Sequence, residues 1–480
     1  MRILLVTYWG LTNMGGIWTY MSQLAAKLRE QGHTVTLMGS NAENQTLYLL
    51  DNNFSFDKKA FYSTLLPHLD PLNYPHLYAE HGIFSFELGR YVFEGGAAYL
   101  GLDGYDIIHA QDPIASYAVR RILKEPVPLI TSVHGALARE AYYEYKALEP
   151  ELTPEKYAGR PIWGYFRRME ALGAEAADMV LVSSRWIGQL VNELGALEKR
   201  VRTIPYGIDV SQYDAKAQMV SSVIPATGCK VIMYAGRLEY IKGVHVLMLA
   251  LGMLHSLRQD WICVLAGIGS LEEPLKAQAI ELGIAERVVF AGKVNNIPAA
   301  LAGADLYVQP SLQDTQPYSV TEAQLAGIAP IVSGTAGMPE MVIPGETGWI
   351  VPPEDAAALA ERLAALLADD QLRARTGRCA REWAASCRSL DVMTARTLEA
   401  YHDTISWHSL QQAEGIYHNS LSMAGEAGAA SLPGAFHPAE VLQPTEQGKI
   451  LAAILRHRLP AAYSIPDARI LARFRPSIHE

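Results

Sequence analysis

Short apolar runs alternate with helical stretches along most of this chain, and this alternation limits its fold more than any other feature. Residues 3–6 form a continuous apolar run, and the loop after it contains Gly15-Gly16. Apolar residues then recur with helical spacing over 21–28, before a second apolar run at 35–37. A strand, a helix and a strand in this order predict a parallel, doubly wound sheet, so we expect an α/β fold.

The alternation occurs in two series, which predicts two similar domains. The first series has further apolar runs at 105–109, 128–133, 178–183 and 201–205, and the second has them at 230–235, 261–266, 288–290, 305–308 and 330–332. The polar, small-residue stretch at 210–228 is the expected interdomain linker. We therefore predict an N-terminal domain at 1–215 and a C-terminal domain at 216–410.

The segments outside the two series are less regular. Residues 41–104 are rich in aromatic side chains and show no clear period. Closing helices are expected at 355–370 and near 390–405, and the second of them is able to cross back to the N-terminal domain. Residues 411–480 are predicted to hold a flexible tether, over 422–438, and a short C-terminal appendage to which the sequence assigns no role.

Charge and cysteine content exclude several classes of protein. There are 40 Lys and Arg against 50 Asp and Glu, a net charge of −10, which disfavours general binding to nucleic acid. The 4 cysteines are scattered and form no C-x-x-C pair, as in a protein of a reducing compartment. The apolar start is too short for a signal peptide, and no run of about 18 apolar residues follows. We expect a cytoplasmic protein without a transmembrane segment.

Several common site motifs are absent from the sequence. It contains no phosphate loop of the G-x-x-x-x-G-K-[ST] type, no H-E-x-x-H zinc helix and no complete G-x-G-x-x-G after the first strand. No Asp-x-Asp pair is present to hold a nucleotide diphosphate through a divalent ion. No metal and no resident cofactor are therefore predicted. The phosphates of a bound nucleotide would have to be neutralised by cationic side chains and backbone N–H groups.

Two cations follow the first strand of the second series. Arg237 comes directly after the strand and Lys242 opens the next helix, so both are expected at the carboxyl end of the sheet, where doubly wound folds bind ligands. A guanidinium and an ammonium beside a helix N-terminus suit a diphosphate. In the first domain, Gly15-Gly16 allows a similar close approach of an anion. Each feature alone is equally consistent with a solvated loop or an ordinary tight turn.

Two carboxylates follow a later strand of the second series. Asp314 is expected in a loop, and Glu322, after seven intervening residues, in the helix that follows. Carboxylates in such places accept hydrogen bonds from sugar and ribose hydroxyls without a metal. The spacing alone is equally compatible with a loop aspartate and a surface glutamate that bind nothing.

In this order and at these spacings, the motifs of residues 1–405 resemble those of the retaining glycosyltransferases of family 4. These enzymes have the GT-B fold, two Rossmann-like domains that face a cleft, and here a short C-terminal tail would be added. The segments that carry the resemblance are Gly15-Gly16, Gly32-His33, Thr131-Ser132-Val133-His134-Gly135, Ile204-Pro205-Tyr206-Gly207-Ile208-Asp209, Gly236-Arg237, Lys242-Gly243, Gly267-Ile268-Gly269, Phe290-Ala291-Gly292-Lys293-Val294, Asp314 to Glu322, Gly337-Met338-Pro339-Glu340 and Gly345-Glu346-Thr347-Gly348.

The resemblance implies a donor site with catalytic residues from both domains. Arg237 and Lys242 would bind the diphosphate of a nucleotide sugar and stabilise it as the leaving group. The backbone of Gly15 and Gly16 would help from the N-terminal domain. His134 would lie beside the donor sugar at the floor of the cleft.

The resemblance also implies contacts for the rest of the donor. Glu322 would hold the ribose hydroxyls, and the backbone of Lys293 and Val294 would meet the base. Asp314 would lie near the transferred sugar as a further catalytic residue. The family usually has Glu at this position. With the shorter side chain of Asp314, one hydrogen bond to the donor sugar would be lost, repositioned or relayed by water.

The implied reaction is metal-independent transfer of a sugar, with retention, from a nucleotide-diphosphate sugar to a hydroxyl of a polysaccharide, lipid-linked or small-molecule acceptor. Two other functions stay open on the sequence alone. One is a catalytically silent sugar-nucleotide-binding subunit that supports a partner glycosyltransferase. The other is a GT-B sugar-nucleotide epimerase.

Two further groups of residues have an open interpretation. The aromatic side chains of 41–104, together with Tyr142, Tyr143, Tyr145, Trp163 and Tyr165, are expected to be core residues for the most part, with an acceptor platform as the alternative. The doublets Arg120-Arg121 and Arg167-Arg168 leave peripheral membrane contact open.

Overall fold

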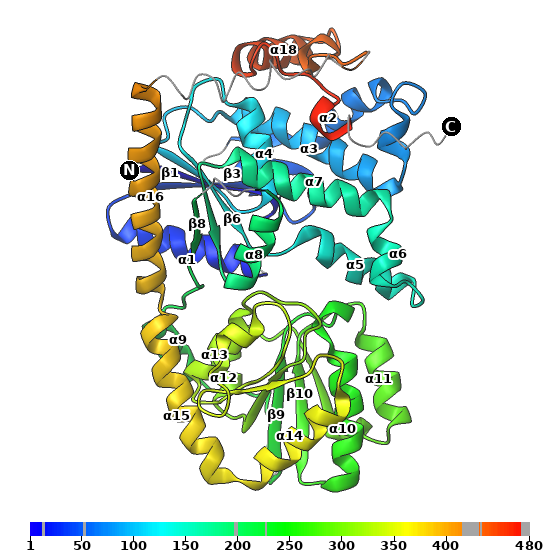
Figure 1. Cartoon of the computed structure of the whole chain (residues 1–480), viewed down its shortest axis with the longest axis vertical. Helices are drawn as coiled ribbons and strands as arrows, with labels where there is room; N and C mark the ends of the chain where they lie inside the picture. Colours follow the sequence, from blue (N-terminus) through cyan, green and yellow to red (C-terminus); the bar gives the residue numbers. More distant parts are fainter. Residues whose placement is uncertain are drawn as a thin grey trace.

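Two sheets, each covered by helices on both faces, form two domains stacked along the long axis of the molecule (Figure 1). The computed structural model of the chain describes residues 1–11, 15–50, 54–195, 200–225, 228–414, 432 and 434–471. The α/β fold with two parallel-sheet domains, predicted from the alternation of apolar runs, is confirmed.

The N-terminal sheet has eight strands in the order β4-β3-β2-β1-β5-β6-β7-β8. These are β1 Arg2–Gly10, β2 Thr34–Ser40, β3 Thr46–Leu49, β4 Ser55–Asp57, β5 Ile107–Ala110, β6 Leu129–Val133, β7 Met179–Val182 and β8 Arg200–Thr203. Six neighbouring strands, β2-β1-β5-β6-β7-β8, run parallel. At the β2 edge, β3 pairs antiparallel with β2 and with β4. The apolar run 3–6 of β1 is fully buried, as expected for a central parallel strand.

The helices of the N-terminal domain include one that the sequence did not predict. They are α1 Gly16–Glu30, α2 Lys58–Leu65, α3 His81–Leu100, α4 Pro113–Ile122, α5 Leu137–Leu148, α6 Pro154–Ala158, α7 Pro161–Ala176 and α8 Arg185–Glu193, with the short 3-10 helices η1 Leu66–His68 and η2 Pro75–Tyr78. The 20-residue α3 lies within the aromatic-rich segment 41–104. Most of its second half is buried on all sides, so it lacks the single apolar stripe from which a helix is recognised.

The C-terminal sheet has six parallel strands in the order β11-β10-β9-β12-β13-β14. They are β9 Lys230–Ala235, β10 Trp261–Ala266, β11 Val288–Gly292, β12 Leu306–Gln309, β13 Ile331–Ser333 and β14 Trp349–Val351. The helices of this half are α9 Val210–Ala217, α10 Val244–Leu257, α11 Glu272–Glu281, α12 Ile297–Leu301, α13 Tyr318–Leu325, α14 Ala356–Ala368 and α15 Asp370–Cys387, with η3 Tyr240–Lys242, η4 Ala285–Arg287 and η5 Met338–Met341.

The chain passes between the domains twice, and the two passages lie side by side. The N–H of Ile208 donates to the carbonyl of Arg388, and the N–H of Leu390 donates to the carbonyl of Ile208, each over 2.9 Å. The helix α9 packs on α12 and α13 of the C-terminal domain. The first passage therefore precedes the stretch 210–228 that we expected as the linker, because that stretch opens with a helix of the second domain.

The last parts of the chain pack on the N-terminal domain (Figure 1). The helix α16, Leu390–Ala413, lies along α1, and the Tyr401 hydroxyl is 2.8 Å from Nδ1 of the buried His109. The segment 434–471 contains η6 Pro438–Glu440, α18 Glu446–Arg458 and α19 Ala468–Leu471, and α18 lies on α3. Of the tether expected at 422–438, residues 422–431 and 433 lie outside the described residues.

A buried group of ion pairs, here called the Arg90 cluster, joins the segment 434–471 to the N-terminal domain. Arg90 lies 2.6 Å from Glu87 and 3.1 Å from Asp467, and it also contacts Glu94. Arg121 lies 3.0 Å from Glu94 and 2.8 Å from Asp467. The appendage therefore completes the core and the charge balance of the first domain.

Candidate active site

The carboxyl ends of the two sheets face each other, and hydrogen bonds connect the loops on the two sides. The Thr315 hydroxyl of the C-terminal domain donates to the backbone carbonyl of His134 over 2.6 Å. The backbone N–H of Tyr206 donates to the Gln316 side chain over 2.9 Å. These bonds place the loop after β6 directly against the loop after β12.

Lys242 and Asp314 meet on the C-terminal side of the cleft. Gly243 has a φ of 66°, and a Cβ on it would lie 2.0 Å from the carbonyl oxygen of Pro310. Only glycine lets the end of η3 lie so close to the loop after β12. The result is a distance of 2.5 Å between Lys242 Nζ and Asp314 Oδ2, and the Ser311 hydroxyl lies 3.4 Å from the same oxygen.

Arg237 lies on the same edge with an exposed side chain and a fixed backbone. Its carbonyl accepts a hydrogen bond from the Tyr234 hydroxyl over 2.7 Å. The glycine loop after β10 packs tightly against it, since a Cβ on Gly267 would lie 1.8 Å from the carbonyl oxygen of Gly236. The Gly-Ile-Gly motif of this loop is thus required by close packing beside the arginine.

His134 follows β6 and has partners inside the protein for both ring nitrogens. Its Nδ1 lies 2.5 Å from the Tyr206 hydroxyl and its Nε2 lies 3.2 Å from Oε1 of Gln111. Burial lowers its pKa to about 3, so the ring is neutral at physiological pH. The imidazole is therefore held in one orientation as a neutral group.

Gly15 and Gly16 lie at the start of α1, close to His134. Gly15 has a φ of 105°, and α1 begins at Gly16. Tyr20, one turn further on, packs on His134 with 4.9 Å between ring centroids. A Cβ on either glycine would meet no described atom within 4 Å. The backbone at this helix start is thus open to the approach of an anion.

Glu322 lies on α13, and Lys293 and Val294 lie in the loop after β11. Burial raises the pKa of Glu322 to about 7, and Lys216 opposes the shift. Within the described residues, the Glu322 carboxylate makes no hydrogen bond or ion pair. Lys293 and Val294 follow β11 at the carboxyl edge of the sheet, and Val294 packs on a core cluster that includes Val320 and Ala323 of α13.

Glu140 is a site residue that the sequence analysis missed. It lies on α5, half-buried, and burial raises its pKa. The charge of Asp314 acts in the same direction, and those of Lys242 and Arg237 oppose it. A single glutamate on a helix carries no sequence signal of its own. Only its place six residues after His134 connects it with the predicted site.

The aromatic residues are divided between the core and the cleft. Phe56, Phe61, Tyr91, Phe93 and Tyr165 are buried in the core of the N-terminal domain, as most of them were expected to be. Tyr142, Tyr143 and Tyr145 are only partly buried on α5. The Tyr143 hydroxyl donates to the carbonyl of Leu312 in the C-terminal domain over 3.3 Å.

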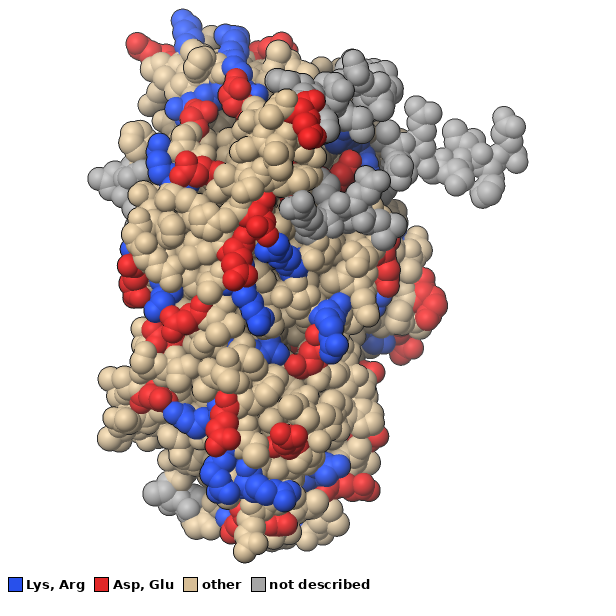
Figure 2. Space-filling view, turned by 60° about the vertical axis from the view of Figure 1, so that its left-hand side comes forward, with Lys and Arg blue, Asp and Glu red and all other residues tan. Residues whose placement is uncertain are grey.

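The arginine doublets are used inside the molecule. Arg120 pairs with Asp178 over 3.1 Å, and Arg121 belongs to the Arg90 cluster. Arg167 lies 3.6 Å from Glu170, and Arg168 donates to a backbone carbonyl of the C-terminal segment. On the face shown in Figure 2, positive and negative side chains are interspersed. The doublets thus direct their charges to protein partners.

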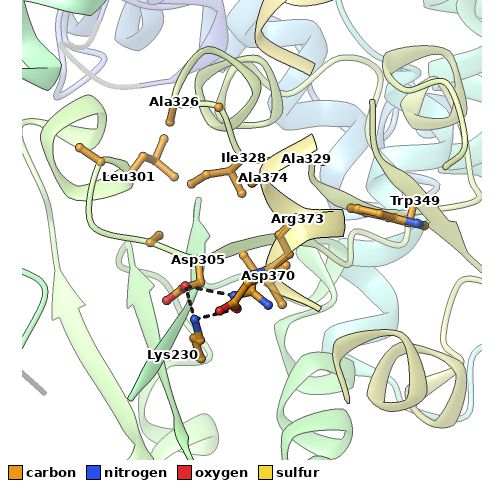
Figure 3. Close-up of a pocket in the computed structure, with 14 residues that line it drawn as sticks. Lys230, Leu301, Asp305, Ala326, Ile328, Ala329, Trp349, Asp370, Arg373 and Ala374 are labelled. Carbon is orange, nitrogen blue, oxygen red and sulfur yellow. Dashed lines mark hydrogen bonds and ion pairs between the residues drawn. The ribbon is translucent and has the colours of Figure 1, made fainter. Parts of the chain in front are cut away.

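A cavity of about 330 Å³ lies at the opposite edge of the C-terminal sheet, away from these residues (Figure 3). Lys230 at the start of β9 pairs with Asp305 over 3.4 Å and with Asp370 over 2.9 Å, and Arg373 pairs with the same two carboxylates. Its charges are therefore matched within the protein. In the described part of the chain, no group of three or more His, Cys, Asp or Glu side chains is placed to hold a metal ion.

Two family models match the chain, one for each domain. The model "Glycosyltransferase Family 4" matches residues 14–212, and the model "Glycosyl transferases group 1" matches residues 219–383. The chain is also 27% identical, over 300 residues, to glycogen synthase of Mycobacterium tuberculosis, a match that covers 62% of this chain and 68% of that protein. No helix in the described ranges has the length and apolar content needed to cross a membrane.

Solved structures share the fold at low sequence identity. Sucrose-phosphate synthase from Thermosynechococcus elongatus has a TM-score of 0.64 and 19% identity, covering 85% of this chain and 100% of that one. HepE of Anabaena, solved in complex with UDP, has a TM-score of 0.57 and 17% identity, covering 84% and 100%. The two facing parallel-sheet domains are thus those of the GT-B fold. With a family model matching each of these domains, the chain belongs to the family 4 glycosyltransferases and is a transferase enzyme.

Proposed function

We propose that this enzyme transfers a sugar from a nucleotide-diphosphate sugar to an acceptor hydroxyl, with retention at the anomeric carbon and without a metal ion. The donor would lie between the domains, with its diphosphate on Arg237 and Lys242. Its base and sugar, and the identity of the acceptor, are left open by this proposal.

The observation that carries the proposal is the meeting of Lys242 and Asp314 beneath the loop of His134. These residues come from two domains and three loops, and the Thr315–His134 hydrogen bond joins the two sides. A lysine, an exposed arginine and an open helix start around one cleft suit an anionic ligand. A UDP complex of a protein with the same fold supports a nucleotide as that ligand.

The chemistry follows from the charges that develop in such a transfer. Breaking the anomeric C–O bond gives an oxocarbenium-like carbon and a diphosphate anion. Arg237 and Lys242 would stabilise the departing anion electrostatically, without a covalent intermediate. Asp314 would accept a hydrogen bond from the sugar after Lys242 turns to the diphosphate. Glu322, whose carboxylate has no described partner, would accept the ribose hydroxyls.

A panel of nucleotide sugars tests the proposal. The purified protein is incubated with UDP-, GDP- and ADP-hexoses, with and without a chelator, and the products are analysed by NMR. Slow hydrolysis or transfer that gives the α-configured sugar from an α-donor, at the same rate with chelator, is the expected result. Binding without turnover would favour a silent subunit. A changed donor sugar without an acceptor would indicate an epimerase, and loss of activity with chelator would overturn metal independence.

A further inference from the structure

Helix α5 brings residues of the N-terminal domain against the loops that carry the two cations. It begins two residues after Gly135 and packs on η3, which ends at Lys242. The bond from the Tyr143 hydroxyl to the carbonyl of Leu312 fixes it to the loop before Asp314. One face of α5 therefore borders the place where the transferred sugar would leave the diphosphate.

Glu140 lies in the first turn of this helix. A Cβ on Gly135 would lie 1.9 Å from its Oε1, so the carboxylate lies directly over the backbone of the His134 loop. The charges of Lys242, Arg237 and Asp314 all act on it. Among the described residues, its carboxylate has no hydrogen-bond partner and no ion pair. Its capacity to accept hydrogen bonds is thus unused by the part of the chain that the structure describes.

A second glutamate, Glu170, holds the first turn of α5, which carries Glu140. Glu170 of α7 is 5% exposed, and its carboxylate accepts a hydrogen bond from the N–H of Ala138 in the first turn of α5, over 3.3 Å. A carboxylate at a helix start also stabilises the helix dipole. The first turn of α5 is therefore anchored, and with it the side chain of Glu140.

We propose that Glu140 sets the charge of the acceptor side of the site, so that the acceptor is a neutral or amine-bearing polyol. A molecule with a phosphate or carboxylate next to the reacting hydroxyl would be disfavoured. This inference rests on the proposed function. With a diphosphate on Arg237 and Lys242 the two positive charges are matched, and Glu140 adds a negative charge that repels an anionic acceptor.

Neighbouring charges on α5 strengthen or oppose this effect. Glu144, one turn further along and exposed, is close enough to Arg237 for that charge to act on it. Arg139, exposed beside Glu140, acts electrostatically on Tyr143. The other cation of this helix, Lys146, donates to the carbonyls of Pro150 and Leu152. Arg139 is therefore the cation of α5 whose charge would reverse the preference, and its replacement is part of the test.

Binding of nucleoside diphosphates tests the charge assignment without an acceptor. UDP, GDP and ADP are titrated by calorimetry into the wild type, Glu140→Gln and the control Glu175→Gln, which removes an exposed carboxylate of the same domain from the C-terminal end of α7. We expect Glu140→Gln to tighten binding about fivefold, since one repulsive charge is removed, and Glu175→Gln to leave it unchanged.

The outcomes separate this inference from the proposed function. Unchanged or weaker binding by Glu140→Gln, with normal binding by the wild type, would overturn the inference alone. If no nucleoside diphosphate binds the wild type, the proposed function itself fails.

Matched acceptors then test the selection directly. Glucose is compared with glucosamine and with glucose 6-phosphate, and glycerol with glycerol 3-phosphate, using the donor that the panel identifies. The wild type should transfer the sugar faster to the neutral or amine-bearing member of each pair. In Glu140→Gln, the ratio of the two transfer rates should fall about tenfold. Preference of the wild type for the phosphorylated members, lost in Arg139→Gln, would overturn the proposal.

Discussion

The Arg90 cluster and the Lys242–Asp314 pair are both ion pairs between distant parts of the chain, yet their surroundings differ. In the cluster, the side chains of Arg90, Glu87 and Glu94 are 0% exposed, and every charge has a partner from the protein. In the pair, the side chains of Lys242 and Asp314 are 17% and 12% exposed and border a cleft. The first arrangement is complete without a ligand, whereas the second can exchange one partner for a substrate. Burial and completeness, more than distance, thus distinguish the structural ion pairs of the Arg90 cluster from the pair for which we propose a function.

The largest expected effect is on stability, and it comes from the Arg90 cluster. Arg90→Ala leaves three buried carboxylates with one arginine, so the free energy of unfolding should fall by about 3–5 kcal/mol. Urea unfolding followed by circular dichroism measures it. The control is Lys276→Ala, which removes two surface ion pairs, with Glu272 and Glu273, and should cost about 1 kcal/mol or less.

A second variant covers the case in which Arg90→Ala does not fold. Asp467→Asn keeps the shape of the cluster and removes one of its charges. If Asp467→Asn lowers the free energy of unfolding no more than Lys276→Ala does, a structural role for the cluster would be contradicted.

The next effect is on activity, and it comes from the cleft pair. Lys242→Ala should lower donor turnover by about 10²–10³-fold, because in the proposed mechanism it removes a cation that would stabilise the leaving diphosphate. Its loss of stability should be smaller than that of Arg90→Ala. Kinetics and unfolding are measured on the same preparation. Turnover equal to that of the wild type would remove Lys242 from the mechanism.

A pH effect is expected at Glu322. Burial raises its pKa to about 7, so the carboxyl is largely protonated below that pH and would have to ionise to accept two ribose hydroxyls as proposed. Donor affinity should therefore rise by up to about tenfold per pH unit as pH increases towards 7, and level off above it.

The matched variant for this effect is Glu322→Gln, which cannot ionise. It should bind the donor more weakly and with a flat profile over the same range. Titration of a nucleotide sugar, whose diphosphate does not titrate there, measures both proteins. If the wild type and Glu322→Gln show the same pH dependence of donor affinity, that dependence comes from another titratable group.

The smallest effect is expected from Asp314→Glu. The longer side chain restores the residue usual in the family and its reach to the sugar, so turnover should rise about two- to threefold, the effect of a modest gain in one hydrogen bond. Steady-state kinetics with the identified donor measures it. Asp314→Asn, which breaks the pair with Lys242, should instead lower turnover. A fall in turnover for Asp314→Glu would mean that the shorter carboxylate is adapted to this site.

The strands and the cleft loops could be predicted because their signals are local. Buried parallel strands are continuous apolar runs, and in such sheets the residues that follow them gather at one edge, as Arg237 and Asp314 do. The helix α3 could not be predicted. Because most of its second half is buried on all sides, apolar and polar residues do not alternate along it with the helical repeat of about 3.6 residues. The role of the appendage could not be predicted either, since Asp467 meets Arg90 only after the chain has crossed both domains.

Individual site contacts were the least predictable. Glu140 belongs to no motif in the sequence, and its proposed role depends on its contact with the His134 loop and on the charge of Lys242 in the other domain. The partners of His134, Gln111 and Tyr206, lie on separate loops, so the neutral, fixed imidazole follows only from the folded structure. Residues of this kind are defined by tertiary neighbours and not by a spacing in the chain.

The paired passage at Ile208 and Ser389 determines how the two halves can move. A Cβ on Gly207 would lie 2.3 Å from the carbonyl oxygen of Ser389, so the two backbones touch where they leave and re-enter the first domain. Because the two interdomain connections are hydrogen-bonded to each other here, they form a single pivot. Sliding of one domain past the other would break these hydrogen bonds. Rotation about that pivot opens the far side most, where α5 meets η3, and there substrates would enter and products leave.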